Sequence, residues 1–274
     1  KSFPVLYTYT VKGQIQRWQI AVQGDSFWTT EGIEGGVLTT SLPTVCKAKN
    51  VGRSNETTPQ EQALAEAQSK WQKKVDKGYN EVLTEEKNFF EPMLAHEIGK
   101  YEKLLFTVPT FIQPKLDGVR CIIKSDGMWS RNGKQILSAP HIYNALIHLF
   151  NEDPHLVLDG ELYCDKDKAD FNTIISCVRK TKPTTFDLDL SEYYIEYRIY
   201  DCPSHSGVFS ERKNYLKNLN LPENCIVLQS ILCSSYKEID ILYKKYLEQG
   251  YEGQMLRTDS YYENKRSKNL LKRS

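Results

Sequence analysis

The sequence predicts an α+β protein in two parts, and three observations support this class. Residues 1–56 alternate apolar and polar side chains in short runs, and a capped helical pattern follows them. From residue 91 onward, strand-like and helix-like patterns mix without a regular strand–helix–strand repeat. A chain of 274 residues, 40% of them hydrophobic, is long enough to bury a core in each part.

The first domain, residues 1–78, is expected to begin with a small antiparallel sheet. Residues 5–10 and 15–20 alternate in polarity with the period of two that a half-buried strand requires. Turn residues stand at Lys12-Gly13 and at Gly24-Asp25, where we expect tight connections between strands.

A helix follows this sheet. Thr58 is a suitable N-cap, Pro59 occupies the first helical position, and Glu61 completes a capping box. Gly78 is a natural stop for the helix, and the polar residues 79–90 are expected to form a linker. The apolar face of the helix comprises Leu64, Ala67, Trp71 and Val75.

The second domain is expected to run from residue 91 to residue 274. A strand near 119–124 should turn at Asp126-Gly127, and Asn132-Gly133 gives a second hairpin signal. We expect a further strand near 194–200 and helices near 139–150, 167–179 and 235–249, the last one between Ser235 and Gly250.

Composition restricts the class of protein. The formal net charge of +1 neither indicates nor excludes a nucleic-acid partner, because a basic face can lie on a neutral chain. No apolar stretch approaches membrane-spanning length, so we expect no membrane partner. The seven dispersed cysteines form no C-x-x-C pair, which predicts reduced thiols in an intracellular protein, and we expect a monomer. Because the chain starts at Lys1 and stops within a basic segment, we expect it to be a fragment.

The hexapeptide KLDGVR at 115–120 is the most informative feature of the chain. A lysine is a useful nucleophile only when it is neutral, which requires desolvation or neighbouring cations. Apolar residues adjoin Lys115, and Gly118 would let the backbone approach a ligand closely. By itself, the pattern fits an exposed Asp-Gly turn equally well. The candidate cations are Arg120, Lys268 and Lys272.

Two later motifs favour the catalytic interpretation. LDGE at 158–161 follows a buried-strand run and delivers Asp159 and Glu161 at its end, on one face of the strand. EGQMLR at 252–257 carries a glutamate and an arginine at the ends of another strand-like run. Taken singly, the first could be a strand that ends in a turn, and the second a surface salt bridge. Together with the lysine, they supply what nucleotidyl transfer needs: a nucleophile, carboxylates for metal and ribose, and cations for phosphate.

These motifs resemble those of the covalent nucleotidyltransferase superfamily, and most closely the ATP-dependent DNA ligases of phage and viral type. The resemblance covers residues 91–274 and implies an adenylation domain of antiparallel sheets flanked by helices, with Lys115 as the nucleophile. It also implies that the aromatic ring of Tyr200 stacks on adenine. The implied ATP- or AMP-binding residues are Gln113, Asp117, Gly118, Arg120, Arg131, Glu161, Tyr200, Arg257, Lys268 and Lys272. The implied ligands of Mg²⁺ (or Mn²⁺) are Glu161, Glu252 and Asp159.

The activity that the resemblance implies is the sealing of nicks in double-stranded DNA with ATP. Lys115 would form a lysyl-AMP, AMP would pass to a 5′-phosphate, and a 3′-hydroxyl would then displace AMP. Two departures from the family pattern stand out. Ser274 occupies the position of a second lysine in the last motif, and no C-terminal oligonucleotide-binding barrel follows it. An NAD⁺-dependent ligase fits less well, because its upstream nicotinamide domain and zinc-finger cysteines are missing.

The N-terminal part resembles, less closely, a WGR-type domain, a small module that contacts DNA. Val51-Gly52-Arg53 stands in for the defining tripeptide. A tryptophan or an arginine at a nick would stack on bases or contact phosphate. In the alternative interpretation, Trp18 and Trp71 are core residues and the helix lysines form a solvated face. The implied DNA-binding residues are Trp18, Arg53, Lys70, Lys74 and, in the second domain, Arg131.

Two other functions remain open from the sequence. RNA ligases and mRNA guanylyltransferases share the lysine motif, so the nick or the nucleotide could differ. A non-enzymatic DNA-binding protein with an inert ligase-like half is the other alternative.

Overall fold

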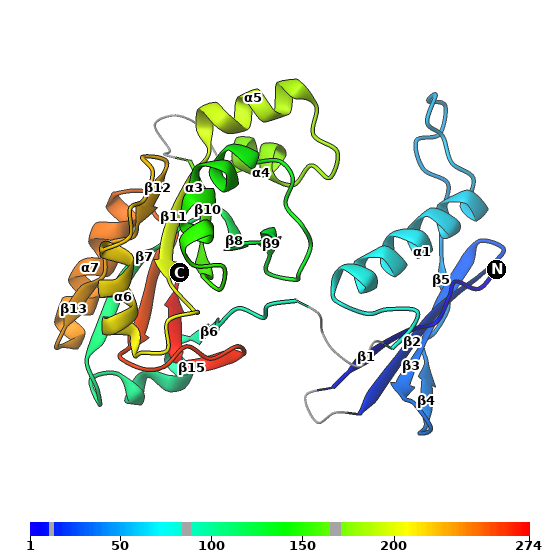
Figure 1. Cartoon of the computed structure of the whole chain (residues 1–274). Coiled ribbons are helices and arrows are strands. Elements are labelled where there is room, and N and C mark those ends of the chain that lie inside the picture. Colours follow the sequence, from blue (N-terminus) through cyan, green and yellow to red (C-terminus); the bar gives the residue numbers. More distant parts are fainter. Residues whose placement is uncertain (11–13, 84–88, 165–170) are drawn as a thin grey trace. The chain divides into compact units, whose positions relative to one another are not determined.

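The computed structural model describes residues 1–10, 14–83, 89–164 and 171–274. It divides the chain into two compact units, Lys1–Asn88 and Phe89–Ser274, whose elements are labelled in Figure 1. The expected turn at Lys12-Gly13, residues 84–88 of the expected linker, and the expected helical residues 167–170 lie outside the described residues.

The first unit contains an antiparallel sheet of five strands among its described residues. The expected turn at Gly24-Asp25 is confirmed, because Gln23 and Ser26 pair across it and Gly24 has a φ of 59°. The strand order is β1-β2-β3-β4, and the short β5 also pairs with β3. The strands are β1 (Leu6–Tyr9), β2 (Ile15–Gln23), β3 (Ser26–Ile33), β4 (Leu38–Thr40) and β5 (Thr44–Val45).

One helix, α1 (Pro59–Asp76), packs on this sheet through β2 and β3. Its capping box is confirmed, because the Glu61 amide donates to the Thr58 hydroxyl and the Glu61 carboxylate accepts from the Thr58 amide. The expected apolar face is wrong at Leu64, which is 37% exposed, while Ala63 is buried in its place. The core of the unit comprises Phe3, Leu6, Trp18, Ile20, Val22, Phe27, Cys46, Ala63 and Ala67.

Two sheets of five strands each form the frame of the second unit, as far as its residues are described. The first has the order β12-β11-β10-β8-β9 and the second the order β13-β7-β14-β15-β6. Neighbouring strands are antiparallel except for β11 with β12 and β15 with β6. The first sheet comprises β8 (Val119–Lys124), β9 (Gly127–Ser130), β10 (Leu158–Tyr163), β11 (Glu196–Asp201) and β12 (Cys225–Val227). The second comprises β6 (Leu94–Glu97), β7 (Thr110–Lys115), β13 (Ile231–Cys233), β14 (Gly253–Thr258) and β15 (Arg266–Arg273).

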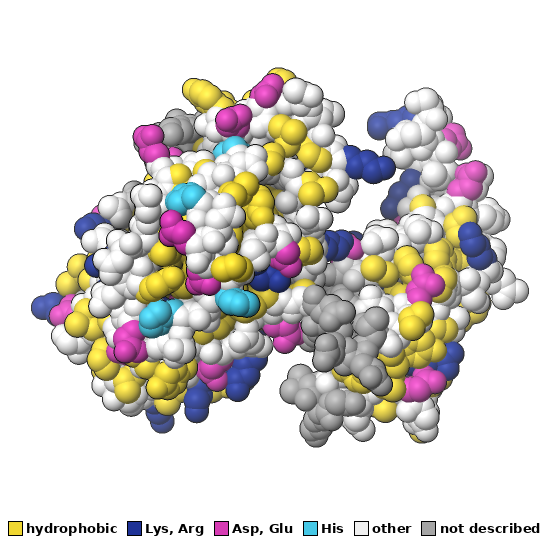
Figure 2. All heavy atoms as spheres, viewed as in Figure 1, with side chains coloured by type: hydrophobic (Ala, Val, Ile, Leu, Met, Phe, Trp, Pro, Cys, Tyr) yellow, Lys and Arg dark blue, Asp and Glu magenta, His cyan; other side chains and the backbone are white. Residues whose placement is uncertain are grey.

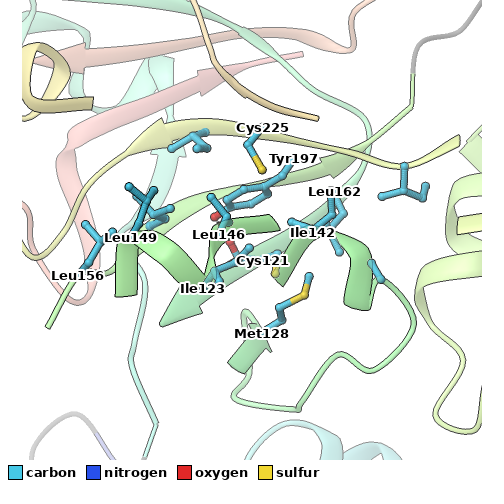
Figure 3. Close-up of a cluster of buried hydrophobic side chains, with 14 of the residues drawn as sticks. Cys121, Ile123, Met128, Ile142, Leu146, Leu149, Leu156, Leu162, Tyr197 and Cys225 are labelled. Carbon is cyan, nitrogen blue, oxygen red and sulfur yellow. Dashed lines mark hydrogen bonds between the residues drawn. The ribbon is translucent and has the colours of Figure 1, made fainter. Parts of the chain in front are cut away.

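Helices cover these sheets and bury their apolar faces. Helix α3 (Pro140–Glu152) contributes Ile142 and Leu146 to a large core that includes Ile123 of β8 and Leu162 of β10 (Figure 3). Helix α7 (Tyr236–Glu248) packs on the second sheet in the same way. The remaining helices are α2 (Ile98–Tyr101), the 3₁₀ helix η1 (Glu102–Leu104), α4 (Phe171–Val178), α5 (Thr185–Tyr194) and α6 (Phe209–Lys217).

Most of the elements expected in this unit are confirmed. The hairpin at Asp126-Gly127 joins β8 to β9, Gly133 has a φ of 77° in its turn, and Ser235 caps α7 by accepting from the Glu238 amide. Helices α5 and α6 were not expected, because neither carries a clear apolar stripe. Polar contacts help to fix them: Asp187 of α5 accepts from Lys180, and the buried Arg212 of α6 donates to Asp201.

The surface of the molecule mixes charges of both signs. On the face shown in Figure 2, acidic and basic side chains are interspersed with hydrophobic ones, which agrees with the net charge of +1. No helix among the described residues is both long enough and apolar enough to cross a membrane.

Candidate active site

A cavity of about 340 Å³ in the second unit collects most of the predicted site residues. This volume is at the lower end of the range for small-molecule sites. The first sheet contributes Arg120, Glu161 and Tyr200, and the second contributes a longer set from β6, β7, β14 and β15. The set comprises Leu94, Ala95, Gln113, Pro114, Lys115, Met255, Arg257, Arg266, Leu270 and Lys272, with Leu116, Gly118, Arg131, Leu228 and Glu252 from the connecting segments.

Lys115 is the last residue of β7 and lies beside Glu252 in the lining of the cavity. The two side chains form an ion pair, and the Glu252 amide donates to the Lys115 carbonyl at 3.1 Å. Gly253 pairs with Lys115 in the sheet, and a Cβ at Gly253 would collide with the carbonyl of Arg273 on β15. The glycine therefore allows the close strand packing that holds Glu252 beside Lys115. Only 17% of the lysine side chain is exposed, so it does not lie in an open turn.

Gly118 explains the glycine in the KLDG pattern. A Cβ on this residue would meet the carbonyl of Leu162 and lie 2.8 Å from Cγ of Glu161. The segment that follows Lys115 can therefore run directly against β10 only because residue 118 has no side chain. This close approach brings the lysine strand and the Glu161 strand to the same cavity.

Glu161 lies opposite Arg120 on neighbouring strands of the first sheet. Arg120 and Glu161 are paired in the β8–β10 ladder, and the Tyr200 hydroxyl donates to Glu161 Oε2 at 3.2 Å. Burial raises the pKa of Glu161 to about 8, although Arg120 and the Tyr200 hydroxyl both act to lower it. A cation or a ribose hydroxyl bound to the Glu161 carboxylate would offset the cost of burying its charge.

The structure corrects two predictions about Asp159. The strand β10 begins at Leu158, so Asp159 lies near the start of the strand and Glu161 within it, rather than at its end. Asp159 is fully buried and is absent from the cavity lining. Its Oδ1 accepts from Arg120 Nε at 3.0 Å, and its Oδ2 accepts from Arg120 Nη2 at 2.6 Å and from the Tyr262 hydroxyl at 2.7 Å. These contacts support a role in holding Arg120 and do not support a role as a metal ligand.

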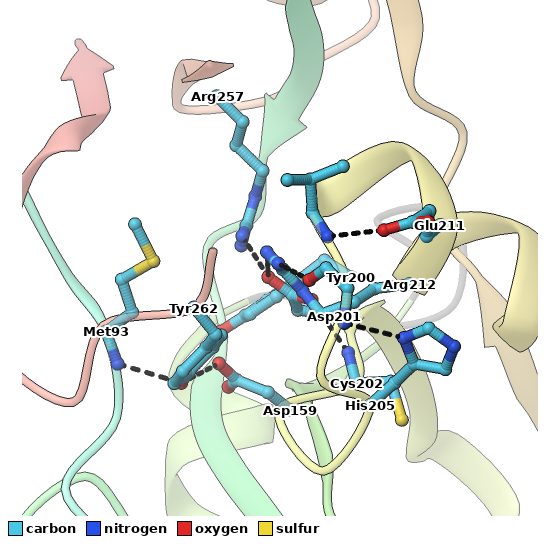
Figure 4. A network of polar contacts seen from close by, with 12 residues as sticks. Met93, Asp159, Tyr200, Asp201, Cys202, His205, Glu211, Arg212, Arg257 and Tyr262 are labelled. Atoms are coloured by element: carbon cyan, nitrogen blue, oxygen red, sulfur yellow. Dashed lines mark hydrogen bonds and ion pairs between the residues drawn. The ribbon is translucent and has the colours of Figure 1, made fainter. Parts of the chain in front are cut away.

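A buried ion network includes Arg257, one of the residues that line the cavity (Figure 4). Asp201 of β11 accepts from Arg212 Nε at 2.6 Å and from Arg257 Nη1 at 2.5 Å, and all three side chains are at most 4% exposed. Although burial opposes its ionisation, Arg257 and Arg212 hold the pKa of Asp201 below its usual value. Arg257 Nε also donates to Gln113 Oε1 at 2.8 Å, and the Gln113 amide nitrogen donates to Ser230. The predicted nucleotide-binding side chains Gln113 and Arg257 therefore also fasten the cavity wall.

The basic residues of β15 do not all reach the cavity. Arg266 and Lys272 line it, and Lys272 pairs with Glu97 at 2.8 Å. Lys268 instead faces a different concavity beside α2 and η1, so its position gives no support to the prediction that it binds the nucleotide. The register between β15 and β6 shifts between Ser267 and Leu271, which breaks the period of two that would have aligned residue 268 with 266 and 272.

Several lining residues were not predicted as site residues. Arg266 lies in the KRS run at 265–267, which was a usable signal, and it contacts the carbonyl of Ala95. Leu94 and Ala95 reach the cavity because β6 pairs in parallel with β15, a pairing that no local pattern indicates. Asp117, which was predicted as a nucleotide contact, is absent from the lining.

The residues predicted to bind DNA in the first unit have different environments. Trp18 is 4% exposed and belongs to the core, so the prediction that Trp18 stacks at a nick is wrong, and the alternative core interpretation holds for it. Lys74 is partly buried, with its Nζ 5.1 Å from the centroid of the Trp18 ring. Arg53 and Lys70 are exposed.

Solved structures share the fold of the second unit. The Chlorella virus DNA ligase-adenylate has a TM-score of 0.53 at 24% identity, covering 67% of this chain and 68% of that one. The ATP-dependent DNA ligase from bacteriophage T7, in complex with ATP, has a TM-score of 0.53 at 19% identity, covering 67% and 68%. The fold is therefore that of the nucleotidyltransferase domains of ATP-dependent DNA ligases.

The sequence comparison identifies the family. The ATP dependent DNA ligase domain matches residues 92–273, and the chain belongs to this family. The DNA ligase of African swine fever virus (strain Badajoz 1971 Vero-adapted) is 25% identical over 245 residues, which cover 82% of this chain and 54% of the relative. The DNA ligase of Enterobacteria phage T4 is 24% identical over 213 residues, which cover 60% and 44%. The chain spans about half the length of the curated relatives that it matches.

The raised pKa of Glu161 predicts a pH dependence of stability. The folded protein keeps this proton up to about pH 8, whereas an unfolded glutamate releases it near pH 4.5. Ionisation therefore favours the unfolded state, and the resulting loss of stability is absent below about pH 4.5 and complete above about pH 8. Glu161→Gln cannot ionise, so it should gain stability relative to the wild type as the pH rises from 5 to 8. Urea unfolding of both proteins, without ATP or metal, measures this difference, and parallel pH profiles would contradict it.

Proposed function

We propose that this chain is an ATP-dependent DNA ligase that seals nicks in double-stranded DNA, with Lys115 as the nucleophile. The observation that carries the proposal is the position of Lys115 at a cavity that also holds Glu161, Glu252, Tyr200 and several arginines. Membership of the ligase family supports the same reaction class. Nick sealing would serve DNA replication, repair or recombination.

In the proposed first step, the Lys115 amine attacks the α-phosphorus of ATP. A nitrogen–phosphorus bond forms, the bond from that phosphorus to pyrophosphate breaks, and lysyl-AMP remains. The amine must be neutral to attack. Lys115 must therefore lose a proton, and its ion pair with Glu252 must break, before the new bond forms. AMP then passes to the 5′-phosphate of a nick, and the 3′-hydroxyl displaces AMP as the strand is joined.

The charged lining residues supply the electrostatic part of the reaction. Negative charge accumulates on phosphoryl oxygens in each step, and fixed cations stabilise it without reorganising. Lys272, Arg131 and Arg266 line the cavity and are the proposed phosphate contacts. Tyr200 presents an aromatic ring, with Arg120 and Arg257 each 5.5 Å from its centroid, and is the proposed contact for adenine.

Mg²⁺ (or Mn²⁺) is the proposed metal, and the residues present fit it. Glu161 and Glu252 are the carboxylates that line the cavity, and no group of three or more His, Cys, Asp or Glu converges anywhere in the described part of the chain. Mg²⁺ is commonly held by one or two carboxylates together with substrate phosphates and water, so a full protein cage is not needed. A metal bound there would neutralise charge on the phosphates of ATP.

All seven cysteines lie among the described residues, are buried and form no disulfide. This supports the proposal that the protein works in a reducing, intracellular compartment, because thiols persist there without pairing. The proposed working form is a monomer.

The direct test of the function is the intact mass of the protein after incubation with ATP and Mg²⁺. We expect the wild type to gain one AMP and to lose it again when pyrophosphate is added. The Lys115→Ala variant should gain no AMP. Lys124→Ala, which removes a lysine of β8 that does not line the cavity, is the matched control and should react like the wild type.

Each other outcome identifies a different alternative. An adduct with GTP in place of ATP would indicate an mRNA guanylyltransferase, and sealing of RNA nicks in preference to DNA nicks would indicate an RNA ligase. No adduct, together with failure to seal a nick that is already adenylylated, would leave an inert DNA-binding protein and refute the proposal.

For the first unit we propose a WGR-like role in binding DNA through its exposed basic residues. Arg53 and Lys70 are exposed, and neither forms a salt bridge with another described residue. The double change Arg53→Glu and Lys70→Glu should weaken binding to nicked duplex. It should also reduce the slope of log affinity against log salt by about 2, roughly 0.9 for each lost phosphate contact. Titrations at several salt concentrations measure this slope.

The control for this titration is a change of the same charge elsewhere. The double change Lys237→Glu and Lys244→Glu alters two exposed residues of α7 and corrects for the overall change in charge. If the double variant binds nicked duplex with the affinity and salt slope of this control, the proposed role of the first unit is refuted.

A further inference from the structure

We propose that Tyr262 is a positioning residue for the nucleotide cavity, and that its hydroxyl fixes the orientation of Arg120 through Asp159. This inference rests on the proposed function, since it explains how one cavity arginine is held in place for an adenylate. Tyr262 itself does not line the cavity.

The Tyr262 side chain is held on every side. Its hydroxyl donates to Asp159 Oδ2 at 2.7 Å and accepts from the Met93 amide at 2.8 Å (Figure 4). Its ring centroid lies 6.1 Å from that of Phe90 and 5.7 Å from the Arg212 guanidinium carbon. A hydroxyl with one donor and one acceptor partner and a packed ring has a single preferred orientation, so it can transmit that orientation to Asp159.

Asp159 depends on this hydroxyl because the carboxylate has no access to water. It is 0% exposed, and its oxygens accept from Tyr262, Arg120 Nε and Arg120 Nη2. A buried carboxylate needs all of its donors, because each lost hydrogen bond leaves charge without compensation. Without the hydroxyl, Asp159 would be held by Arg120 alone, and the pair could shift together.

Among the three hydrogen-bonded residues Tyr262, Asp159 and Arg120, it is Arg120 that lines the cavity. Two of its three guanidinium nitrogens are bound to Asp159, so the plane of the group is fixed. Nη1 donates no hydrogen bond to another described residue, and it is therefore the nitrogen that a bound nucleotide can use. Pre-organisation of this nitrogen lowers the cost of binding, so its loss should appear in nucleotide affinity before it appears in the rate of the chemical step.

Tyr262 could instead serve only to fasten its own segment to Met93. That role would lower stability, but its effect on nucleotide binding would not depend on Arg120. Coupling between Tyr262 and Arg120 in nucleotide affinity therefore separates the two roles, in the manner of a double-mutant cycle.

The experiment measures the initial rate of AMP-adduct formation on the full chain at increasing ATP concentrations. Tyr262→Phe keeps the packed ring and removes only the hydroxyl. We expect the half-saturating ATP concentration to rise about tenfold, the effect of one charge-assisted hydrogen bond, with the maximal rate changing less than twofold. Tyr261→Phe, at the adjacent and 66% exposed tyrosine, is the matched control and should leave both values unchanged.

The same substitution is then made in an Arg120→Gln protein. If Tyr262 acts through Arg120, the half-saturating concentration of this protein should not rise further when the hydroxyl is removed. A rise of equal size in both backgrounds, or no rise in the wild-type background, overturns the inference. If Tyr262→Phe does not fold, Asp159→Asn replaces it, because this change weakens the same contact at its other partner. An unchanged half-saturating ATP concentration in Asp159→Asn also overturns the inference.

A failure of the proposed function is distinguishable in this assay. Wild-type protein that forms no adduct at any ATP concentration refutes the ligase proposal, and this inference with it. Wild-type protein that reacts, beside a Tyr262→Phe variant that behaves identically, refutes the inference alone.

Discussion

The rest of the second unit depends on the buried ion pairs that the Asp201 carboxylate forms with Arg257 and Arg212. Asp201 lies on β11 of one sheet and binds Arg257 on β14 of the other, while Arg212 reaches it from α6. Removing one partner from a buried ion network leaves an uncompensated charge, so such a network tolerates only one arrangement of its elements. The two sheets are thereby held at the separation that leaves a cavity between them, and Lys115 and Glu161 approach that cavity from opposite sheets.

Several residues of the site both stabilise the fold and line the cavity. Arg257 lines the cavity while it binds Asp201 and Gln113. Arg120 faces the cavity while it neutralises Asp159. Such fixed cations suit phosphoryl chemistry, which requires charge stabilisation at fixed positions more than it requires proton transfer. The charges that the proposed function requires are in this sense in place before a nucleotide binds.

The sequence predicted the chemistry of the site better than its construction. Lys115, Glu161 and Glu252 were predicted from short motifs, and the structure brings all three to one cavity, because each motif occupies a strand or its end and needs little tertiary information. Lys268 was misplaced because a register shift in β15 interrupts the simple alternation of side chains. Trp18 was misplaced because a tryptophan in a strand looks the same in sequence whether it faces a helix or solvent. The parallel pairing of β6 with β15 and the polar fastening of α6 depend on residues distant in sequence, which no local pattern reveals.

The most direct test of this account is the unfolding free energy and AMP affinity of Asp201→Asn, compared with Asp240→Asn. Asp240 also pairs with an arginine, Arg273, but its side chain is 59% exposed, so its loss should cost at most about 1 kcal/mol. Loss of the buried charge at Asp201 should cost about 3–5 kcal/mol and abolish AMP binding, because Arg257 and Arg212 would be left unpaired. A stability and an AMP affinity equal to those of Asp240→Asn would contradict the claim that this network holds the two sheets and their cavity together.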